Sequence, residues 1–205
     1  EEFSRLCPFS PIARNEDDLA AEHLAAAPVV DAKLGRFSAA FVGHDGPDVR
    51  AAGSSGGMVS WVAAELMRRG EIDGVLHVHP GQPGEPFFGY RISRSQDELL
   101  AGARSRYHAI HLAEVLREVR AMPGRYAVVG IPCFIKAVHL ARAQDAVLAE
   151  RITHMLGLFC GHMKSARFVQ SFAWQLGAEH ERVRAVEYRL KDANRPANWY
   201  TAHLT

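Results

Sequence analysis

The chain has 205 residues, 48% of them hydrophobic, so it can bury a large core within one domain. Lys and Arg (24) nearly balance Asp and Glu (23), and a net charge of +1 gives no strong field for binding nucleic acid or an anionic membrane. No apolar run approaches the roughly 18 residues that span a bilayer, and the first residues show no secretory signal. We therefore expect a cytoplasmic globular protein with no nucleic-acid partner and no membrane span.

Hydrophobic periodicity and turn residues predict alternating helices and strands along the whole chain. In chain order we expect a helix over 16–27, a strand over 36–42, a turn over 43–48, a helix over 58–69, strands over 74–78 and 86–92, helices over 96–103 and 112–121, a strand over 125–130, a helix over 134–143, a strand over 155–159, a helix over 166–174, a strand over 183–189 and a loop over 191–200. Asn15, Ser95 and Ser165 are the expected N-cap residues.

A strand followed by a turn and a helix occurs three times in this pattern. Such repetition predicts an α/β fold with a largely parallel or mixed central sheet flanked by helices, as one domain over 1–205. Ligands of such folds collect at the carboxyl ends of the strands, so the turns that follow the strands are expected to converge there.

The Gly-Ser-rich segment of residues 53–57 directly precedes the helix expected over 58–69. A backbone free of bulky side chains that opens into a helix N-terminus suits a phosphate or another anion. The alternative is a glycine turn that only permits a tight connection into the helix.

Three cysteines, Cys7, Cys133 and Cys160, lie more than 25 residues apart. This spacing does not suggest a secreted disulfide framework, and it leaves reduced thiols or metal ligands. Cys133 precedes a predicted helix whose N-terminus favours the thiolate form. The alternative for both Cys133 and Cys160 is a small buried hydrophobic side chain. His77 and His79 share one face of a predicted strand, where packing or surface roles are favoured over metal binding.

Three signatures in the right order resemble the family of coenzyme F-420 hydrogenase/dehydrogenase beta subunits. The first is the segment of residues 53–57 with its helix, the following Gly-Glu-Ile-Asp-Gly-Val of residues 70–75, and Arg-Ser-Arg-Tyr at 104–107. The second is Val-Gly-Ile-Pro-Cys-Phe-Ile-Lys-Ala at 129–137, and the third is Gly-Leu-Phe-Cys-Gly-His at 157–162, followed by Lys164 and Ser165.

This resemblance implies a flavin-dependent, iron-sulfur-linked oxidoreductase that transfers a hydride at FAD. Members of the family pair FAD with iron-sulfur clusters, and the founding members exchange a hydride with the deazaflavin coenzyme F-420. The implied partners are a small-molecule electron donor or acceptor, such as a deazaflavin, and an electron-transfer partner subunit.

The resemblance also implies roles for particular residues. The implied cofactor-binding residues are Gly53, Ser54, Ser55, Gly56, Gly57, Ser105, Tyr107 and Pro132; the implied catalytic residues are Cys133, Lys136 and His162; the implied metal ligands are Cys7, Cys133 and Cys160. Ser105 and Tyr107 have the alternative of ending a helix and packing on the core, and His162 has a structural alternative. Lys164 is expected beside the cofactor, whereas Arg104 and Arg106 are expected to be solvated, with a phosphate contact as their alternative.

The chain departs from the family pattern at both ends. Relatives carry a Cys-x-x-Cys segment downstream and a ferredoxin-like stretch upstream, of which residues 1–14 with Cys7 resemble the last part. We therefore expect a fragment in which a [4Fe-4S] cluster of the intact protein is incomplete. Two other functions stay open: a non-redox member that binds or processes a sugar-linked substrate in polysaccharide biosynthesis, and an electron-transfer subunit of a larger complex.

Overall fold

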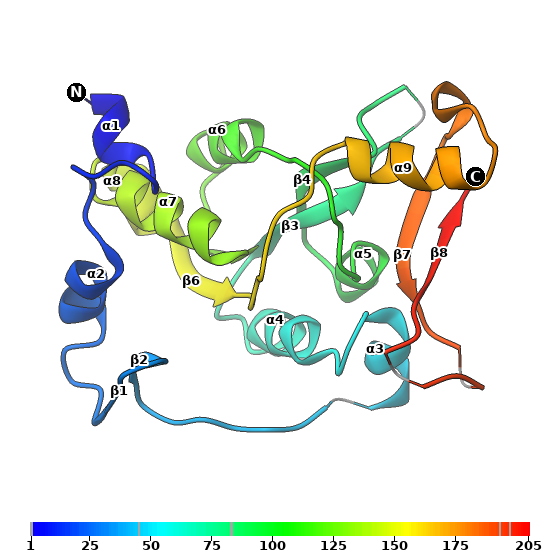
Figure 1. Cartoon of the computed structure of the whole chain (residues 1–205). Helices are drawn as coiled ribbons and strands as arrows, with labels where there is room; N and C mark the ends of the chain where they lie inside the picture. Colours follow the sequence, from blue (N-terminus) through cyan, green and yellow to red (C-terminus); the bar gives the residue numbers. More distant parts are fainter. Residues whose placement is uncertain (1, 45, 83, 193, 197) are drawn as a thin grey trace.

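A computed structural model describes residues 2–44, 46–82, 84–192, 194–196 and 198–205 (Figure 1). Its elements are α1 (Glu2–Leu6), α2 (Glu16–His23), β1 (Val29–Asp31), β2 (Gly35–Phe37), α3 (Pro47–Ala52), α4 (Met58–Arg68), β3 (Gly74–Pro80), β4 (Phe88–Ser93), α5 (Gln96–Ala101), α6 (Ala113–Ala121), β5 (Tyr126–Gly130), α7 (Pro132–Arg142), α8 (Ala146–Arg151), β6 (Ile152–Gly157), α9 (Arg167–Gln175), η1 (His180–Arg182), β7 (Val186–Leu190) and β8 (Thr201–Leu204).

The centre of the fold is a four-stranded sheet in the order β4-β3-β5-β6. β3 pairs with β5, and β5 with β6, in parallel, whereas β4 returns antiparallel to β3 at the edge. Leu76 lies opposite both Ile92 and Val128, and Val128 lies opposite Met155. The predicted α/β fold with a mixed central sheet is therefore confirmed.

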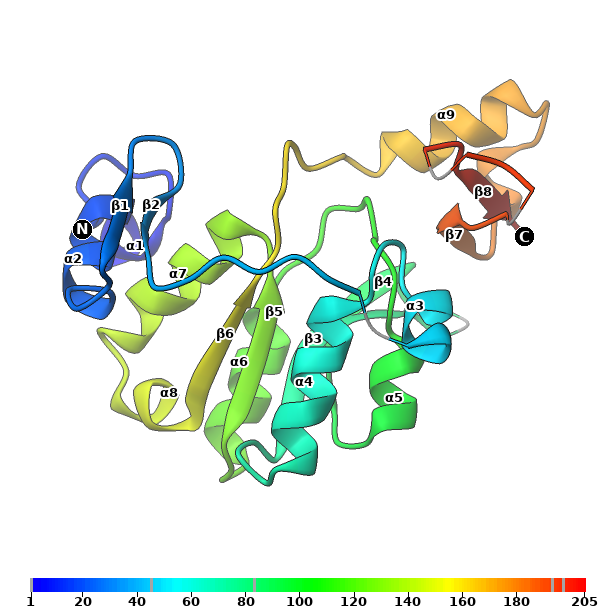
Figure 2. The ribbon, with the colours of Figure 1, turned by 90° about the horizontal axis from the view of Figure 1, so that it is seen from below.

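Alternation along the strands builds two cores on opposite faces of the sheet. Leu76 and Val128 point to one face, where they pack with residues of α6, α7 and α8. Their neighbours Val75 and Ala127 point to the other face and pack with α4 and α5. Figure 2 shows these helices on the two sides of the strands. The carboxyl ends of β5 and β6 border the cavity that contains the candidate site.

Two groups of elements flank this layered unit, as Figure 2 shows. The N-terminal group, α1 to β2, lies beside α7, to which Glu16 of α2 is joined by an ion pair with Lys136. The C-terminal group consists of α9 and the antiparallel hairpin β7–β8. It builds a third core in which Phe88 of β4 packs with Val169 and Tyr188. The hairpin is therefore attached to the sheet through β4.

Several expected elements differ in the first third of the chain. The strand expected over 36–42 is wrong for most of its length, because β2 ends at Phe37 and the apolar side chains of Phe41 and Val42 are exposed instead of paired. Of the turn expected over 43–48, residue 45 lies outside the described residues, and residues 47 and 48 belong to α3. As a result, the Gly-Ser-rich segment of residues 53–57 follows a helix and not a strand. The helix expected over 16–27 begins at its predicted cap Asn15 but ends at His23.

Further differences lie near the C-terminus. β6 runs over Ile152–Gly157, three residues earlier than expected, because the unpredicted helix α8 precedes it directly. α9 has Ala166 at its N-cap and no side-chain cap, so Ser165 is not the cap residue. The loop expected over 191–200 is followed by β8, whose partner β7 lies more than ten residues away in sequence.

One capping contact in this fold yields a direct stability test. Asp145 caps α8 by accepting hydrogen bonds from the N–H groups of Val147 (2.9 Å) and Leu148 (3.1 Å), and it also pairs with Arg120. We expect Asp145→Ala to lower the free energy of unfolding by about 1 kcal/mol, a fall of about 2–4 °C in Tm, measured by thermal unfolding. Arg120→Gln removes only the exposed pair and is expected to change stability by less than about 0.5 kcal/mol. Equal losses in the two variants would contradict the capping role.

Candidate functional site

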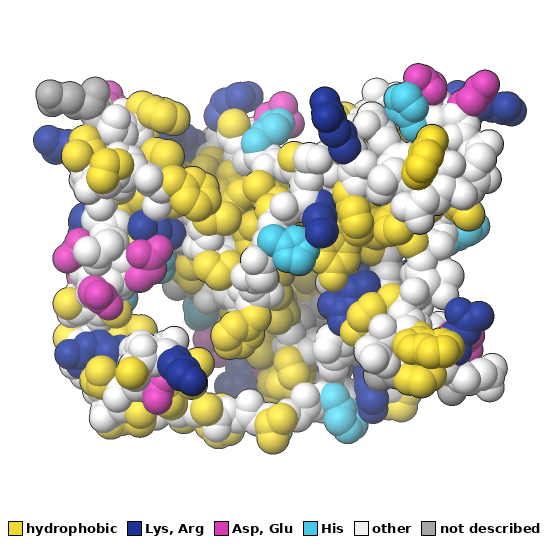
Figure 3. All heavy atoms as spheres, viewed as in Figure 1, with side chains coloured by type: hydrophobic (Ala, Val, Ile, Leu, Met, Phe, Trp, Pro, Cys, Tyr) yellow, Lys and Arg dark blue, Asp and Glu magenta, His cyan; other side chains and the backbone are white. Residues whose placement is uncertain are grey.

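A cavity of about 620 Å³ opens at the carboxyl ends of β5 and β6, a size typical of small-molecule sites. Most of its lining comes from residues 53–60 at the start of α4, residues 102–108 after α5, the end of β5 with the start of α7, and residues 158–164 after β6. Single residues complete it: Gly43, His77 and Val78 of β3, Tyr90 of β4, Leu99 of α5, Ile110, and Arg189 of β7. In Figure 3, Lys and Arg side chains lie among hydrophobic ones over the region where Figure 1 shows α5 and α3. The parallel strand ends thus converge as predicted, and segments outside the sheet complete the cavity.

The Gly-Ser-rich segment folds tightly against α3. Gly57 is the N-cap of α4 with a φ of 82°, and a Cβ there would lie 3.0 Å from the carbonyl oxygen of Val49. A Cβ at Gly53 would lie 3.4 Å from the same oxygen, and one at Gly56 3.3 Å from the carbonyl oxygen of Gly43. Because Gly57 carries no side chain, α4 has no side-chain cap, and the first residues of the helix line the cavity. The helix start therefore presents backbone N–H groups to a ligand.

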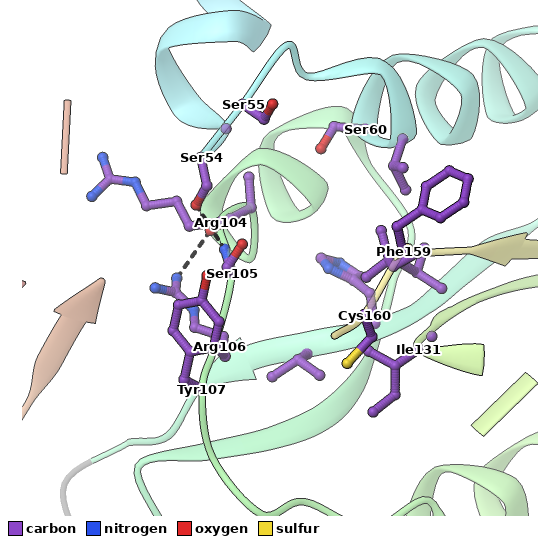
Figure 4. Close-up of a pocket in the computed structure, with 18 of the residues that line it drawn as sticks. Ser54, Ser55, Ser60, Arg104, Ser105, Arg106, Tyr107, Ile131, Phe159 and Cys160 are labelled. Atoms are coloured by element: carbon purple, nitrogen blue, oxygen red, sulfur yellow. Dashed lines mark hydrogen bonds between the residues drawn. The ribbon is translucent and has the colours of Figure 1, made fainter. Parts of the chain in front are cut away.

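Hydrogen bonds tie this segment to two distant parts of the chain. Ser54 is buried, and its Oγ accepts a hydrogen bond from the N–H of Ser105 at 2.8 Å. Lys191 follows β7, and its Nζ donates to the carbonyl oxygens of Ser55 (2.8 Å) and Arg50. Figure 4 shows Ser54 and Ser105 close together on one wall of the cavity. The structure therefore brings two serines of the first signature, 51 residues apart in sequence, into direct contact.

Arg106 lies in this wall and is largely buried, so the expectation that it is solvated is wrong. Its Nη2 donates to the carbonyl oxygen of Ala103 at 3.0 Å, and its Cζ lies 5.3 Å from the ring centroid of Phe88. Its Nε and Nη1 are buried and have no hydrogen-bond partner among the described residues. Burial, followed by repulsion from Arg104, lowers the pKa of Arg106 to about 10.

Arg104 and Arg189 flank Ser105 and share an unusual backbone geometry. Apart from glycines, they are the two residues in the described ranges with a positive φ, at 95° and 56°. Such a conformation costs on the order of 1–3 kcal/mol per residue. Arg104 forms an ion pair with Glu187 at 3.0 Å, and Nη1 of Arg189 donates to Ser105 Oγ at 3.4 Å. The cavity wall is thus rich in arginine and contains backbone strain.

His77, His79 and Ser93 form a compact polar cluster next to this wall, and His77 itself lines the cavity. Nε2 of His77 lies 2.7 Å from Ser93 Oγ and 2.8 Å from Nε2 of His79, and Nε2 of His79 lies 2.9 Å from Ser93 Oγ. His77 is 6% exposed, and burial, followed by the charges of His79 and Arg106, lowers its pKa to about 3. Both rings are therefore neutral near pH 7, in the packed role favoured from the sequence.

The opposite wall of the cavity is mainly apolar. Ile131 and Phe134 follow β5, and Leu158, Phe159 and Cys160 follow β6. Figure 4 shows Ile131, Phe159 and Cys160 across the cavity from the serines and arginines. A ligand with one flat apolar part and one anionic part therefore matches the division of the two walls.

The predicted thiols do not all reach this cavity. Cys160 lines it and is exposed, whereas Pro132 and Cys133 lie in the first turn of α7 and are not among its lining residues. Cys7 directly follows α1, in the N-terminal group. Among the described residues, no group of three or more His, Cys, Asp and Glu side chains is arranged to bind a metal.

The remaining predicted residues divide between the cavity and other surfaces. Tyr107 and His162 line the cavity, and the ring of Tyr107 also packs against Tyr188 at 5.4 Å between centroids. Lys164 lines it as well and lies 5.0 Å above the ring of Phe168. Lys136 instead points to α2, where its Nζ pairs with Glu16 at 3.1 Å. The structure therefore does not bring Lys136 to the cavity.

Sequence reasoning missed several residues of the site. Arg189 and Lys191 belong to a C-terminal segment for which only a strand and a loop were expected, and Arg106 was assigned to the surface. A signal for Arg189 existed, because the alternating pattern of residues 183–189 places its basic side chain at the end of a strand. No sequence pattern indicates that the guanidinium of Arg106 is buried.

The chain belongs to the family of coenzyme F420 hydrogenase/dehydrogenase beta subunits. The family's N-terminal model matches residues 40–117, and its C-terminal model matches residues 124–203. This confirms the resemblance found from the three signatures. Together the two models include every segment that lines the cavity.

Two relatives illustrate the relationship. A subunit of the F(420)H(2) dehydrogenase of Methanosarcina mazei is 30% identical over 110 residues, which are 54% of this chain and 30% of the relative. A chain of the F420-reducing [NiFe] hydrogenase complex from Methanosarcina barkeri, studied by xenon derivatization, matches with a TM-score of 0.62 and 18% identity, covering 78% of this chain and 57% of that chain. This chain thus spans under a third of the first relative and over half of the second, and the structural match supports the fold.

The relatives' names describe redox proteins, which agrees with the class of function predicted from the sequence. A search of the described helices for a long apolar segment gave no candidate membrane span.

Proposed function

We propose that this chain binds FAD in the cavity and belongs to an oxidoreductase that transfers a hydride at the flavin. The observation that supports the proposal best is the division of the cavity between two unlike walls. One wall combines the N-terminus of α4, serines of which Ser54 is buried, and arginines, and the other is formed by apolar side chains after β5 and β6.

The residues of the cavity fit a dinucleotide with a flat ring and a charged diphosphate. Gly57 and Gly53 keep the backbone close to α3, where a Cβ would approach the carbonyl oxygen of Val49, and this leaves the start of α4 open to phosphate oxygens. The apolar side chains of Ile131 and Phe159 suit the faces of an isoalloxazine ring.

Bound flavin would supply the redox chemistry, accepting or donating a hydride. The chain's own groups bind and orient the cofactor and exclude water. The hydroxyls of Ser55 and Ser60 are available to ring or phosphate oxygens, while Ser54 holds the 53–57 segment against Ser105. Lys164 and His162 add a cation and a hydrogen-bonding group beside the apolar wall. Cys133 and Lys136, outside the cavity lining, would act on the chemistry only through α7.

An iron-sulfur cluster does not fit the cysteines of these residues by themselves. The sequence contains three cysteines, whereas a [4Fe-4S] cluster takes four thiolate ligands. A cluster that uses Cys7, Cys133 or Cys160 would need ligands from outside these 205 residues, and we derive no electron-transfer step through it.

We assign the partners by analogy with the relatives. A deazaflavin is the proposed electron donor or acceptor, because both relatives are named for F420 chemistry. A partner subunit is a further proposal, because one relative comes from a hydrogenase complex. Phe41 and Val42 expose nearly all of their side chains, and such surfaces suit a subunit contact. The cytoplasmic location stays a prediction.

The proposal is tested by anaerobic flavin binding to the full chain. We expect saturable quenching of FAD fluorescence, visible flavin absorption after gel filtration, and bleaching of that absorption on addition of a reduced deazaflavin. Lys136→Gln, which lies outside the cavity, is the matched control and is expected to bind FAD unchanged. A chain that remains colourless at high FAD concentration would contradict the proposal and favour the non-redox alternative with a sugar-linked substrate.

A further inference from the structure

The side chain of Arg106 is incompletely satisfied. Only Nη2 has a hydrogen-bond acceptor, the carbonyl oxygen of Ala103, while the buried Nε and Nη1 have none among the described residues. Buried donors without acceptors are unfavourable, and a charged guanidinium more so than a neutral group. Arg106 lines the cavity, but Nε and Nη1 themselves have almost no exposed surface, so an acceptor in the cavity would reach them after a small rotation of the guanidinium.

No carboxylate of the described chain is placed to serve Arg106. The one acidic side chain recorded near it, Glu187, is 3.0 Å from Nη1 of Arg104 and 47% exposed. Arg104 and Arg106 therefore share a single partly solvated carboxylate. The balance of charge in this wall is positive, which an anionic ligand would offset.

A second guanidinium is in the same situation. Arg189 donates to Ser105 Oγ and, through Nη2, to the hydroxyl of Tyr200 at 2.6 Å, but its Nε is buried and has no partner in the described ranges. Its φ of 56° requires a strained backbone to hold the side chain at the cavity. The guanidinium is held at the cavity by these two hydrogen bonds and by the Tyr200 ring, 4.3 Å from its Cζ, and its Nε stays without an acceptor among the described residues.

We infer that Arg106 and Arg189, with the hydroxyl of Ser105 between them, bind a phosphate group of the ligand in the cavity. The planar guanidinium matches two phosphate oxygens at once, and a phosphate offers enough oxygens for both arginines and a hydroxyl. The inference deepens the proposed function, because it locates the anionic end of the ligand on the wall that also carries the start of α4. The phosphate has two possible sources, FAD itself or a phosphorylated second substrate.

The test uses inorganic pyrophosphate as the probe and the full chain without flavin. We expect pyrophosphate at about 100 times its Kd to raise Tm by about 5–10 °C. Arg106→Gln should weaken pyrophosphate binding at least about tenfold and should not lower the Tm of the free protein, because it removes an unpaired buried charge. A structural role for Arg106 predicts the opposite, a lower Tm with pyrophosphate binding retained.

Arg142→Gln is the matched control. Arg142 also has a buried Nε with no partner in the described part of the chain, but its Nη2 donates to the carbonyl oxygen of Ala149 in α8, and it is not among the lining residues of the cavity. We expect this variant to retain the full pyrophosphate effect. If Arg106→Gln does not fold, Arg106→Lys keeps the charge without the planar fork and is expected to weaken binding severalfold. No shift in the wild type, or an equal shift in wild type and Arg106→Gln, would overturn the inference.

Flavin titrations separate the two sources of the phosphate. If FAD supplies it, Arg106→Gln weakens FAD binding but not riboflavin binding, and FAD-loaded protein no longer binds pyrophosphate. If a second substrate supplies it, FAD binding is unchanged and the FAD-loaded protein still binds pyrophosphate. Pyrophosphate binding by a chain that binds neither flavin would support the phosphate site and refute the proposed FAD function.

Discussion

Lowering the pH from 7 to 5 is expected to reduce the free energy of unfolding by about 2 kcal/mol through His77 alone. The unfolded histidine takes up a proton near pH 6.5, whereas in the folded protein burial, with the charges of His79 and Arg106, lowers its pKa to about 3. The unfolded state therefore binds more protons below pH 6.5, and stability is lost as the pH falls through that value. His79, His108 and His139 also have lowered pKa values and add to the same trend.

The contribution of His77 is isolated by the slope of stability against pH. Urea unfolding at pH 7 and at pH 5 should show that His77→Gln loses about 2 kcal/mol less unfolding free energy between these two pH values than the wild type does. This difference does not depend on the absolute stability of the variant. His203→Gln, on the exposed side of β8, is the control and should keep the wild-type slope. Identical slopes for His77→Gln and the wild type would contradict a neutral buried His77.

The second large effect is expected from Gly57→Val. The φ of 82° is unfavourable for a side chain branched at Cβ, and that Cβ would lie 3.0 Å from the carbonyl oxygen and 3.1 Å from Cγ1 of Val49. Strain and overlap together should lower the free energy of unfolding by about 3 kcal/mol, a fall of about 6–12 °C in Tm. Movement of the segment away from α3 should also weaken FAD binding by at least about tenfold, because the start of α4 is displaced.

Gly157→Val provides the comparison for this variant. Gly157 ends β6, has no positive φ, and a Cβ there would meet no atom within 4 Å. A valine is well tolerated at such a strand position, so Tm should change by less than about 2 °C. Calorimetry and FAD titration of both variants measure the two effects, and a Gly57→Val protein with wild-type Tm and FAD affinity would contradict the geometry.

The sheet and the helices on its faces followed from local patterns. β3 and β5 are short apolar runs that end in turn residues, and α4 and α6 carry apolar stripes at helical spacing. In these elements the spacing of apolar residues in the sequence matches the side chains that the fold buries. The strand expected over 36–42 failed because an apolar run also fits a segment that exposes Phe41 and Val42. β8 was missed because its four residues are stabilised by pairing with β7, which local sequence does not encode.

The cavity was predictable where motifs carried the information. The segment of residues 53–57 and Cys160, both named from the signatures, lie in the cavity lining. The burial of Arg106 results from packing on Phe88 of β4, and the position of Arg189 results from the attachment of the hairpin to that strand. Contacts between segments that are distant in sequence produce no pattern of residue spacing from which they could be predicted.

The contact of Lys191 with the carbonyl oxygens of Ser55 and Arg50 has a consequence for the modularity of the molecule. The two family models divide the chain after residue 117, yet this lysine from the second half supports the backbone of the first half's glycine segment. A graft of residues 40–117 onto another scaffold would therefore transfer the motif without its support. The binding surface thus depends on contacts between the two halves of the chain, so a functional exchange between relatives needs both halves.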